Sequence, residues 1–304
     1  MKAVRINQWG QPAQIEDIDR PSPASDEVLV RVHAASINPI DVIVAAGYLQ
    51  AMLTVPMTAG TDFAGEVITV GADVSHVNPG DSVYGCIALR GGTFAEYVVV
   101  KVAEVAAKPS SLDSIQAASV PLSALTAWQG LNRSLKIKAG ERLLIHGVAG
   151  NVGSFAAQFA RLSGVEVIGT AAAKDEAFVR SLGLNRWIDH TKTKFEEEAG
   201  EVDAVFASIG GEVIPRSFAV MKPAGRLVTT GQMAGADEAQ QRGLQATGMA
   251  CEASIDDLAA IARLIDAGEV KVHVTDTVPF DQFQRGFELH QDHSRGRRKV
   301  VLTL

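Results

Sequence analysis

Three evenly spaced glycines are the feature of this sequence that most directly suggests chemistry. They lie in Gly147-Val-Ala-Gly150-Asn-Val-Gly153, between an apolar run of strand length and a segment with helical periodicity. Glycines at such a turn let the backbone approach a pyrophosphate, while the helix N-terminus offers unpaired N–H groups. The spacing departs from the commoner G-x-G-x-x-G, so the prediction depends on the strand before it and the helix after it. We therefore expect a dinucleotide site here, with a ligand-free glycine turn as the alternative.

The residues after the next strand indicate which dinucleotide binds. Folds that bind NAD usually end this strand with Asp or Glu, which accepts hydrogen bonds from the ribose 2′-OH. Here the strand 165–169 is followed by Thr170, three alanines and Lys174. A lysine attracts the 2′-phosphate that a carboxylate would repel. The sequence favours NADP(H), and we interpret Asp175 and Glu176, one turn later, as charges at a helix start.

The elements around this turn alternate between strand and helix, as a parallel sheet covered on both faces requires. Strands are expected at 143–147, 165–169, 186–189, 203–207 and 226–230, and helices at 152–160, 212–221 and 256–267. Residues 117–128 read as a buried helix kinked at Pro121. The first third differs, because its β-branched strands are separated by Gly- and Pro-containing turns, a pattern typical of an irregular antiparallel barrel. The fold class is therefore α/β, with a doubly wound parallel sheet and a second, β-rich domain.

Length and composition exclude several other classes of protein. A chain of 304 residues predicts about two domains, and 47% hydrophobic residues supply a core. The net charge of −7 argues against a nucleic-acid or anionic-membrane partner. No apolar run reaches the roughly 20 residues of a membrane span, and residues 1–9 lack the apolar stretch of a secretory signal. We expect a cytoplasmic protein.

Nearly the whole chain carries sequence blocks of one enzyme family, in the right order. On these blocks the chain resembles the medium-chain dehydrogenase/reductase superfamily, and within it the zinc-free quinone oxidoreductase (zeta-crystallin-like) branch. The resemblance implies a GroES-like catalytic domain in residues 1–118 and 270–304 and a Rossmann-type NADP-binding domain in residues 119–269. The blocks are residues 1–4, 32–41, 60–67, 78–85, 92–97, 117–122, 126–131, the glycine turn and 297–302.

A catalytic or structural zinc is not expected. Zinc-dependent members of the superfamily carry a Cys where this chain has Asn38-Pro-Ile-Asp41, and Gly-His-Glu where it has Gly60-Thr61-Asp62. They also carry a four-cysteine lobe, whereas this chain has only Cys86 and Cys251. A catalytic zinc needs about three protein ligands that converge on one ion.

The resemblance also implies site residues. It places Asn38, Tyr48 and Asp62 at the nicotinamide end of the cleft as candidate catalytic residues. Asn38 could donate to a substrate oxygen or be only a turn residue before Pro39, and Tyr48 could donate a proton or merely cover the cleft. The run from Arg295 to Lys299 is interpreted as a solvated turn or as a loop that contacts cofactor phosphates. The expected cofactor-binding residues are Asn38, Thr126, Gly147, Ala149, Gly150, Asn151, Val152, Thr170, Ala171, Lys174, His190 and Gly231.

These features predict an NADPH-dependent oxidoreductase that transfers hydride to a quinone without a metal. A quinone or an enone accepts hydride readily, so the protein must mainly position it and stabilise the developing oxyanion. Three alternatives stay open: a reductase of α,β-unsaturated ketones or aldehydes, a zinc-free alcohol dehydrogenase-like protein, and a non-catalytic nucleotide-binding relative. The resemblance further implies a homodimer through an edge strand in residues 243–251.

Overall fold

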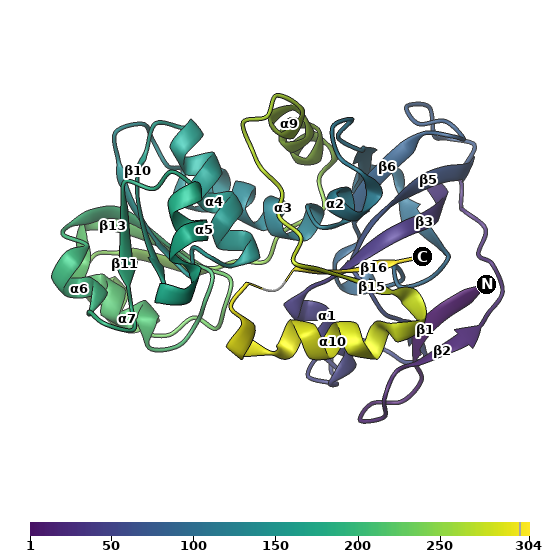
Figure 1. Ribbon diagram of the computed structural model, residues 1–304, viewed down its shortest axis with the longest axis horizontal. Coiled ribbons are helices and arrows are strands. Elements are labelled where there is room, and N and C mark those ends of the chain that lie inside the picture. Colours follow the sequence, from purple (N-terminus) through teal and green to yellow (C-terminus); the bar gives the residue numbers. More distant parts are fainter. Residues whose placement is uncertain (298) are drawn as a thin grey trace. The chain divides into compact units, whose positions relative to one another are not determined.

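The computed structural model describes residues 1–297 and 299–304, without the side chains of residues 88 and 293. The described chain divides into two compact units (Figure 1). Unit 1 comprises Met1–Leu125 and Glu252–Leu304, and unit 2 comprises Thr126–Cys251. Both chain ends therefore belong to unit 1, and unit 2 is inserted into it.

Unit 2 is built on a six-stranded sheet in which every neighbouring pair is parallel. The strand order is β11-β10-β9-β12-β13-β14, which reads 3-2-1-4-5-6 along the chain and is the order of doubly wound dinucleotide-binding sheets. The expected α/β fold class is confirmed. The strands are β9 (Arg142–His146), β10 (Glu166–Ala171), β11 (Arg186–Asp189), β12 (Val202–Ala207), β13 (Met221–Thr229) and β14 (Gln245–Gly248).

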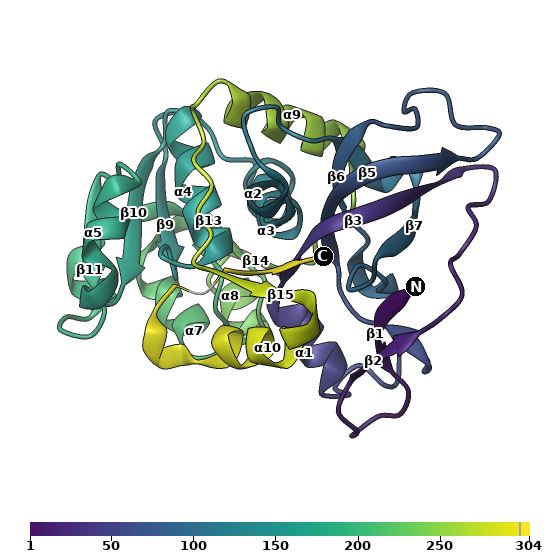
Figure 2. The ribbon, with the colours of Figure 1, turned by 45° about the vertical axis from the view of Figure 1, so that its right-hand side comes forward.

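Helices cover both faces of this sheet (Figure 2), and this explains why its central strands are almost wholly apolar. The helix α4 packs through apolar residues at helical spacing, which lie on its buried face: Phe155, Ala156, Phe159 and Ala160. The expected helix 212–221 is shorter, since α7 continues only as a 3₁₀ turn before β13. The helical elements are η3 (Gly130–Leu135), α4 (Asn151–Leu162), η4 (Ala173–Asp175), α5 (Glu176–Ser181), α6 (Phe195–Glu198), α7 (Val213–Ser217), η5 (Phe218–Val220) and α8 (Ala236–Gln241).

Unit 1 is mostly antiparallel sheet. Its long strand β3 pairs with three others, β5, β7 and β16, and so organises a seven-stranded sheet. A smaller sheet has the order β2-β1-β4. The strands are β1 (Lys2–Ile6), β2 (Gln14–Asp17), β3 (Glu27–Ile37), β4 (Met57–Thr58), β5 (Asp62–Val70), β6 (Ser82–Cys86), β7 (Tyr97–Lys101), β8 (Val105–Ala107), β15 (Asp276–Pro279) and β16 (Val300–Thr303).

The helices of unit 1 lie between and after these strands. One sequence expectation is corrected here: residues 117–128 are two helices rather than one helix kinked at Pro121. Pro121 is the first residue of α3, a position where its missing N–H costs no helical hydrogen bond. The elements are α1 (Pro39–Ala45), η1 (Ala88–Arg90), η2 (Val102–Glu104), α2 (Ser114–Ala118), α3 (Pro121–Gln129, which crosses into unit 2), α9 (Ile255–Asp266), η6 (Phe280–Gln282), α10 (Phe283–Gln291) and η7 (His293–Arg295).

The helix α9 belongs to unit 1, although the sequence suggested the nucleotide-binding domain. The Tyr84 hydroxyl donates to the Leu258 carbonyl at 2.7 Å. The Asp266 carboxylate accepts from the backbone and the hydroxyl of both Ser110 and Ser111. The units consequently divide at 125/126 and 251/252, whereas the expected boundaries were 118/119 and 269/270. Amphipathic periodicity indicated the helix but not which sheet its apolar face covers.

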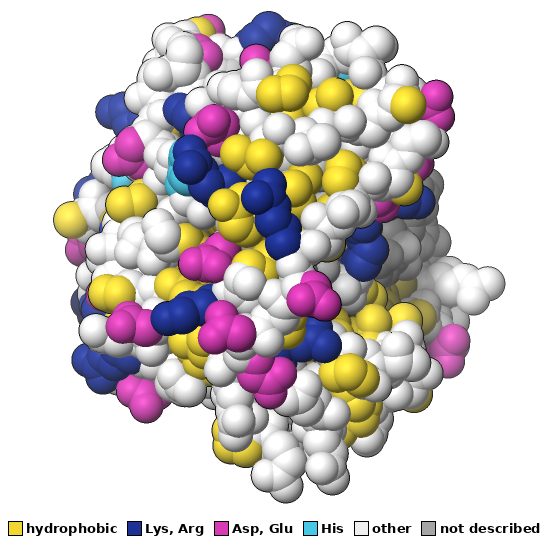
Figure 3. Space-filling view, turned by 90° about the vertical axis from the view of Figure 1, so that its right-hand side faces the viewer, with side chains coloured by type: hydrophobic (Ala, Val, Ile, Leu, Met, Phe, Trp, Pro, Cys, Tyr) yellow, Lys and Arg dark blue, Asp and Glu magenta, His cyan; other side chains and the backbone are white. Residues whose placement is uncertain are grey.

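The surface carries charges of both signs. On the face shown in Figure 3, Lys and Arg side chains alternate with Asp, Glu and apolar side chains instead of gathering in one basic patch. Among the helices of the described residues, none is both long enough and apolar enough to cross a bilayer.

Candidate functional site

The glycine turn joins β9 to α4. Gly147 has a φ of +74°, the left-handed region that favours glycine. The Gly150 N–H donates to the Gly147 carbonyl at 2.9 Å, and this hydrogen bond closes the turn. A Cβ atom on Gly153 would lie 2.3 Å from the Gly147 oxygen, so only glycine lets the first turn of α4 approach so closely. The turn and the N-terminus of α4 form the cradle that a pyrophosphate requires.

The other expected cofactor residues of unit 2 follow the ends of neighbouring strands. Thr170 and Ala171 close β10, and the His190 N–H after β11 donates to the Ala171 carbonyl at 3.3 Å. Gly231 follows β13, and a Cβ there would lie 2.7 Å from Gly210 Cα, after β12. Parallel strands end together, so these residues share the carboxyl edge with Gly147, Ala149, Gly150, Asn151 and Val152. Open α/β sheets bind their ligands at this edge.

Two of the expected residues of unit 2 have polar side chains that are buried. Thr170 is 3% exposed and its hydroxyl pairs with His146 Nδ1 at 3.1 Å. His146 Nε2 meets Ser217 Oγ at 2.9 Å, and burial lowers the pKa of His146 to about 3, so the imidazole is neutral. The Thr170 hydroxyl is therefore engaged inside unit 2, and the Thr170 carbonyl accepts from the Val148 N–H at 3.1 Å. Thr126, on α3, is also buried, with 7% of its surface exposed.

Lys174 lies in η4, three residues beyond the end of β10. Its side chain is exposed. No acidic residue occupies the end of β10, where Ala171 and Ala172 stand instead. This is the position at which the 2′ substituent of an adenosine ribose is recognised in such folds. The residues of unit 2 thus fit an NADP(H) dinucleotide.

Ser208 is a residue at this edge that the sequence did not single out. It follows β12, which is adjacent to β9 where the strand order reverses. Its N–H and its hydroxyl both donate to the His146 carbonyl, at 3.2 and 2.8 Å. A Cβ on Gly147 would come within 2.7 Å of its Oγ. Ser208 braces the glycine turn, a role visible only once the strand order is known.

In unit 1 the structure brings two of the three candidate catalytic residues into contact. Asn38, between β3 and α1, donates from Nδ2 to Asp62 Oδ2 at 2.9 Å and to Thr61 Oγ1 at 3.2 Å. Asn38 is 1% exposed and Asp62 is fully buried. The amide hydrogens that were expected to meet a substrate oxygen are therefore engaged inside the protein.

Lys299 completes this group, and for this residue both expectations for the basic run are wrong. Its ammonium is buried, donates to Asn38 Oδ1 at 2.9 Å and lies 3.6 Å from Asp62 Oδ2. It is neither solvated nor available to phosphates. Arg295, in contrast, is an ordinary surface partner of Asp276 at 2.8 Å, and Arg298 lies outside the described residues.

The two carboxyl groups in this buried cluster have different surroundings. Asp62 accepts hydrogen bonds from Ser36 Oγ at 3.0 Å and from the Leu122 N–H at 2.9 Å, in addition to Asn38. Burial raises the pKa of Asp62, while Lys299 and these donors oppose the shift. Burial likewise lowers the pKa of Lys299, and Asp62 and Asp41 oppose that shift.

Asp41 accepts fewer hydrogen bonds than Asp62. Its Oδ2 accepts from the Asn38 N–H at 2.8 Å and from Thr61 Oγ1 at 3.4 Å, and its Oδ1 has no hydrogen-bond partner among the described residues. Burial, with the charge of Asp62 adding to it, raises the pKa of Asp41 to about 8. At neutral pH Asp41 keeps its proton, and the three ionisable groups together carry no net charge.

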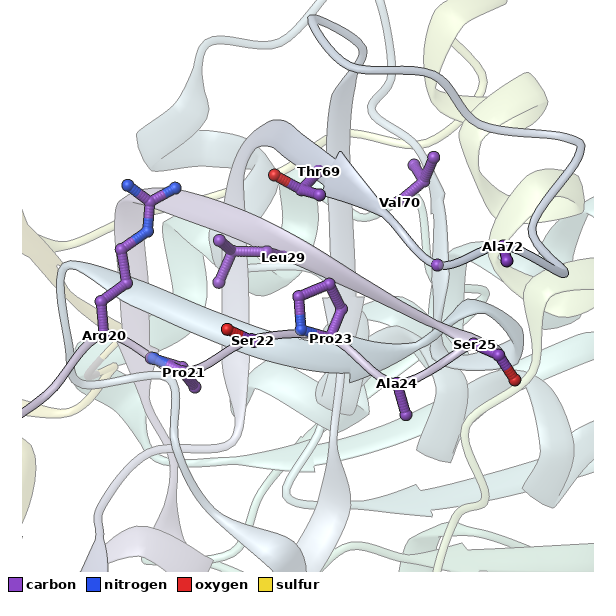
Figure 4. Close-up of a pocket in the computed structure, with 11 residues that line it drawn as sticks. Arg20, Pro21, Ser22, Pro23, Ala24, Ser25, Leu29, Thr69, Val70 and Ala72 are labelled. Atoms are coloured by element: carbon purple, nitrogen blue, oxygen red, sulfur yellow. The ribbon is translucent and has the colours of Figure 1, made fainter.

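Tyr48, the third candidate, lies elsewhere. It is 80% exposed in the segment after α1, near Met52, which is 70% exposed. A hollow of about 650 Å³ in unit 1 also lies apart from the candidates. It is bounded by residues 20–25, Leu29 and 69–72, and Figure 4 shows the Arg20 and Pro23 side chains on its walls.

The residues of unit 1 do not fit a zinc ion. The positions that the family resemblance assigns to zinc ligands hold the Asn38 amide, the Thr61 hydroxyl and the Asp62 carboxylate. The ammonium of Lys299 donates to the amide and lies 3.6 Å from the carboxylate. In the described part of the chain, no group of three or more His, Cys, Asp or Glu side chains is arranged to hold a metal. A zinc site needs neutral or anionic donors, which an ammonium cannot supply.

Comparisons with known proteins agree with a two-domain dehydrogenase. The family model "Alcohol dehydrogenase GroES-like domain" matches residues 24–110, and "Zinc-binding dehydrogenase" matches residues 182–302. The mouse mitochondrial NAD(P)H oxidoreductase RTN4IP1 is 32% identical over 322 residues, covering 90% of this chain and 81% of the mouse protein.

Solved structures give the same result. The quinone oxidoreductase of Coxiella burnetii has a TM-score of 0.90 at 32% identity, covering 100% of this chain and 99% of that one. The Escherichia coli quinone oxidoreductase, solved with NADPH, has a TM-score of 0.89 at 26% identity, with both chains fully covered. The chain belongs to the medium-chain dehydrogenase/reductase superfamily, in its zinc-free quinone oxidoreductase branch. It is an oxidoreductase that uses a nicotinamide cofactor.

The protonated state of Asp41 has a measurable effect on stability. A carboxyl group whose folded-state pKa is raised from 3.8 to about 8 is protonated when folded and ionised when unfolded between those values. The free energy of unfolding therefore falls as pH rises through this window, by up to about 1.4 kcal/mol per pH unit. Asp41→Asn keeps an acceptor for the Asn38 N–H and has no proton to lose. In urea unfolding, the free energy of unfolding of Asp41→Asn should therefore rise relative to that of the wild type from pH 5 to pH 8.

Asp266→Asn is the control, because Asp266 should affect the pH dependence of the free energy of unfolding in the opposite direction. Hydrogen bonds from Ser111 and Ser110 lower the pKa of Asp266 to about 2, so its contribution is complete above the unfolded-state pKa and fades as pH falls. This variant should lose stability most at neutral pH. Parallel curves for the wild type and Asp41→Asn would show that Asp41 is ionised in the folded protein.

Proposed function

We propose that this protein is an NADPH-dependent reductase that transfers hydride to quinones without a metal ion. The observation that carries the proposal is the carboxyl edge of the unit 2 sheet. There the glycine turn follows β9, and Lys174 follows β10 with only alanines between them. Support for the acceptor comes from relatives named quinone oxidoreductases in pig and in Coxiella burnetii. The buried ammonium of Lys299 supports a reaction that does not use zinc.

The residues of unit 2 would hold the cofactor as follows. The turn from Gly147 to Asn151 and the N-terminus of α4 would bind the pyrophosphate through backbone N–H groups. Lys174 and His190 would face the 2′-phosphate. Gly231, after β13, would leave room for the cofactor because it has no side chain. NADPH, when bound, supplies the hydride. The protein would then hold the acceptor in place and donate a hydrogen bond to the oxygen that gains charge, and a proton from water would complete the hydroquinone.

A panel of acceptors tests the proposal. We expect NADPH oxidation with 1,4-benzoquinone and 1,2-naphthoquinone, weaker oxidation with cyclohexenone or acrolein-type enals, and lower kcat/KM with NADH. Dialysis against a chelator should leave the rate unchanged, because no step uses a metal. Faster turnover of enones would reassign the acceptor, and no turnover with any acceptor would favour a non-catalytic protein. Zinc bound at one ion per chain, with activity lost on its removal, would contradict the metal-free reaction.

Lys174 is proposed to set the preference for NADPH. Its contact with a phosphate is a charge-assisted interaction on the order of 1.5–3 kcal/mol if partly desolvated. Lys174→Ala should therefore raise KM for NADPH by about one to two powers of ten and leave KM for NADH and kcat nearly unchanged.

Lys138→Ala is the matched control for this experiment. Lys138 is an exposed lysine of the same unit that precedes β9 and so lies toward the opposite edge of the sheet. Equal effects of Lys174→Ala on both cofactors would mean that Lys174 supports the fold rather than the phosphate.

We further propose a homodimer through the edge strand β14. The strand is the outermost of the six, pairs only with β13 in the described chain, and three of its four residues are exposed. An unpaired strand edge is a template for a second copy, and twofold symmetry is the commonest closed arrangement. Light scattering should give twice the chain mass of 32.1 kDa. A mass of one chain at all concentrations would refute the dimer.

A further inference from the structure

We propose that Lys299 is a positioning residue, a built-in cation that fixes the orientation of the Asn38 amide. The proposal rests on the proposed function only for its kinetic test. It begins with strand register: β16 pairs antiparallel with β3, and Val300 lies opposite Ile37. One step beyond this ladder, residue 299 faces residue 38. The C-terminal strand thus carries a lysine to a partner 261 residues away.

The backbone of Lys299 is held firmly. Its carbonyl accepts from the Thr275 N–H at 2.9 Å, the Thr275 hydroxyl at 2.9 Å and the Asp276 N–H at 3.3 Å. Its side chain, 1% exposed, ends among Asn38, Asp62 and Asp41, with the Cys86 thiol as a further neighbour in its electrostatic surroundings. A lysine anchored at its backbone and buried along its length can hold its ammonium at one place.

That ammonium determines which way the Asn38 amide points. An ammonium only donates, so it requires the oxygen Oδ1 of Asn38 on its side. The nitrogen Nδ2 is then directed to Asp62 Oδ2, an acceptor, and to Thr61 Oγ1. A flipped amide would put N–H groups against the ammonium and an oxygen against the carboxylate. Lys299 and Asp62 therefore select the same orientation from opposite ends.

The orientation extends to the start of α1. The Asn38 N–H donates to Asp41 Oδ2, and this pair caps the helix that leads to the segment bearing Tyr48. Substituting Lys299 would leave Asp62 as a buried carboxylate without its cation and free the amide to turn. The effect would then spread to α1, because Asn38 caps this helix and Asp41, near the ammonium, lies in its first turn.

The test compares Lys299→Met with Lys101→Met, an exposed lysine of the same unit. The chain has six asparagines, so selective ¹⁵N-asparagine labelling gives few side-chain signals. The Asn38 signal is the one lost in Asn38→Ala. We expect its two amide hydrogens to exchange with water about tenfold faster in Lys299→Met and unchanged in Lys101→Met. Without the ammonium on Oδ1 the amide can turn, and its hydrogens leave Asp62 and Thr61. An unchanged exchange rate in Lys299→Met, with the other five signals in place, overturns the proposal.

A kinetic cycle tests the same claim through activity. Lys299→Met should lower kcat for quinone reduction about tenfold in the wild-type background and less than about twofold in the Asn38→Ala background. Equal factors in both backgrounds would show that Lys299 does not act through Asn38. If Lys299→Met does not fold, the double variant Lys299→Met/Asp62→Asn replaces it, because it removes the unpaired carboxylate. This double variant is then measured both with Asn38 and with Asn38→Ala. A wild type that reduces no acceptor refutes the proposed function, while the exchange measurement still decides on Lys299.

Discussion

Ionisable groups that are buried away from water must balance their charges, and in unit 1 this constraint falls on Asp41, Asp62 and Lys299. Removing one partner of a buried ion pair typically costs about 3–5 kcal/mol, because the other charge is left uncompensated. The arrangement here satisfies the constraint with one ammonium, one well-hydrogen-bonded carboxylate and one carboxylic acid. Its members come from β3, α1, β5 and the approach to β16, so the cluster ties together segments from both ends of the chain.

The nucleotide-binding unit depends on a different constraint, the close approach of backbone segments at the carboxyl edge of a parallel sheet. Gly147, Gly153 and Gly231 each sit where a Cβ atom would collide with a neighbouring turn or side chain. Ser208 and His146 hold the strand ends behind this edge through a partly buried hydrogen bond at Ser208 and a buried one between His146 and Thr170. The edge therefore offers closely packed backbone groups where a cofactor would bind, with Lys174 as an added charge.

Local pattern was enough to predict much of this. These predictions used patterns among neighbouring residues: the glycine turn, the alternation of strands and helices, and the alanines before Lys174. In the structure, the glycine turn and the segment before Lys174 lie at the same edge of the sheet. Lys299 was not predictable in the same way. In the sequence it ends a basic run, and only the pairing of β16 with β3 turns it inward toward Asn38. The assignment of α9 to unit 1 also depends on residues distant in the sequence, namely Tyr84 and the serines at 110 and 111.

The most direct test of the charge balance is the ¹³C resonance of the Asp41 side-chain carboxyl, assigned by its loss in Asp41→Asn and followed as pH is raised. We expect the chemical shift of a protonated acid at pH 7 and a transition centred near the raised pKa of about 8. A carboxylate shift at pH 7, with no transition between pH 6 and pH 9, would contradict the account, because the cluster would then carry a net negative charge in the interior of the protein.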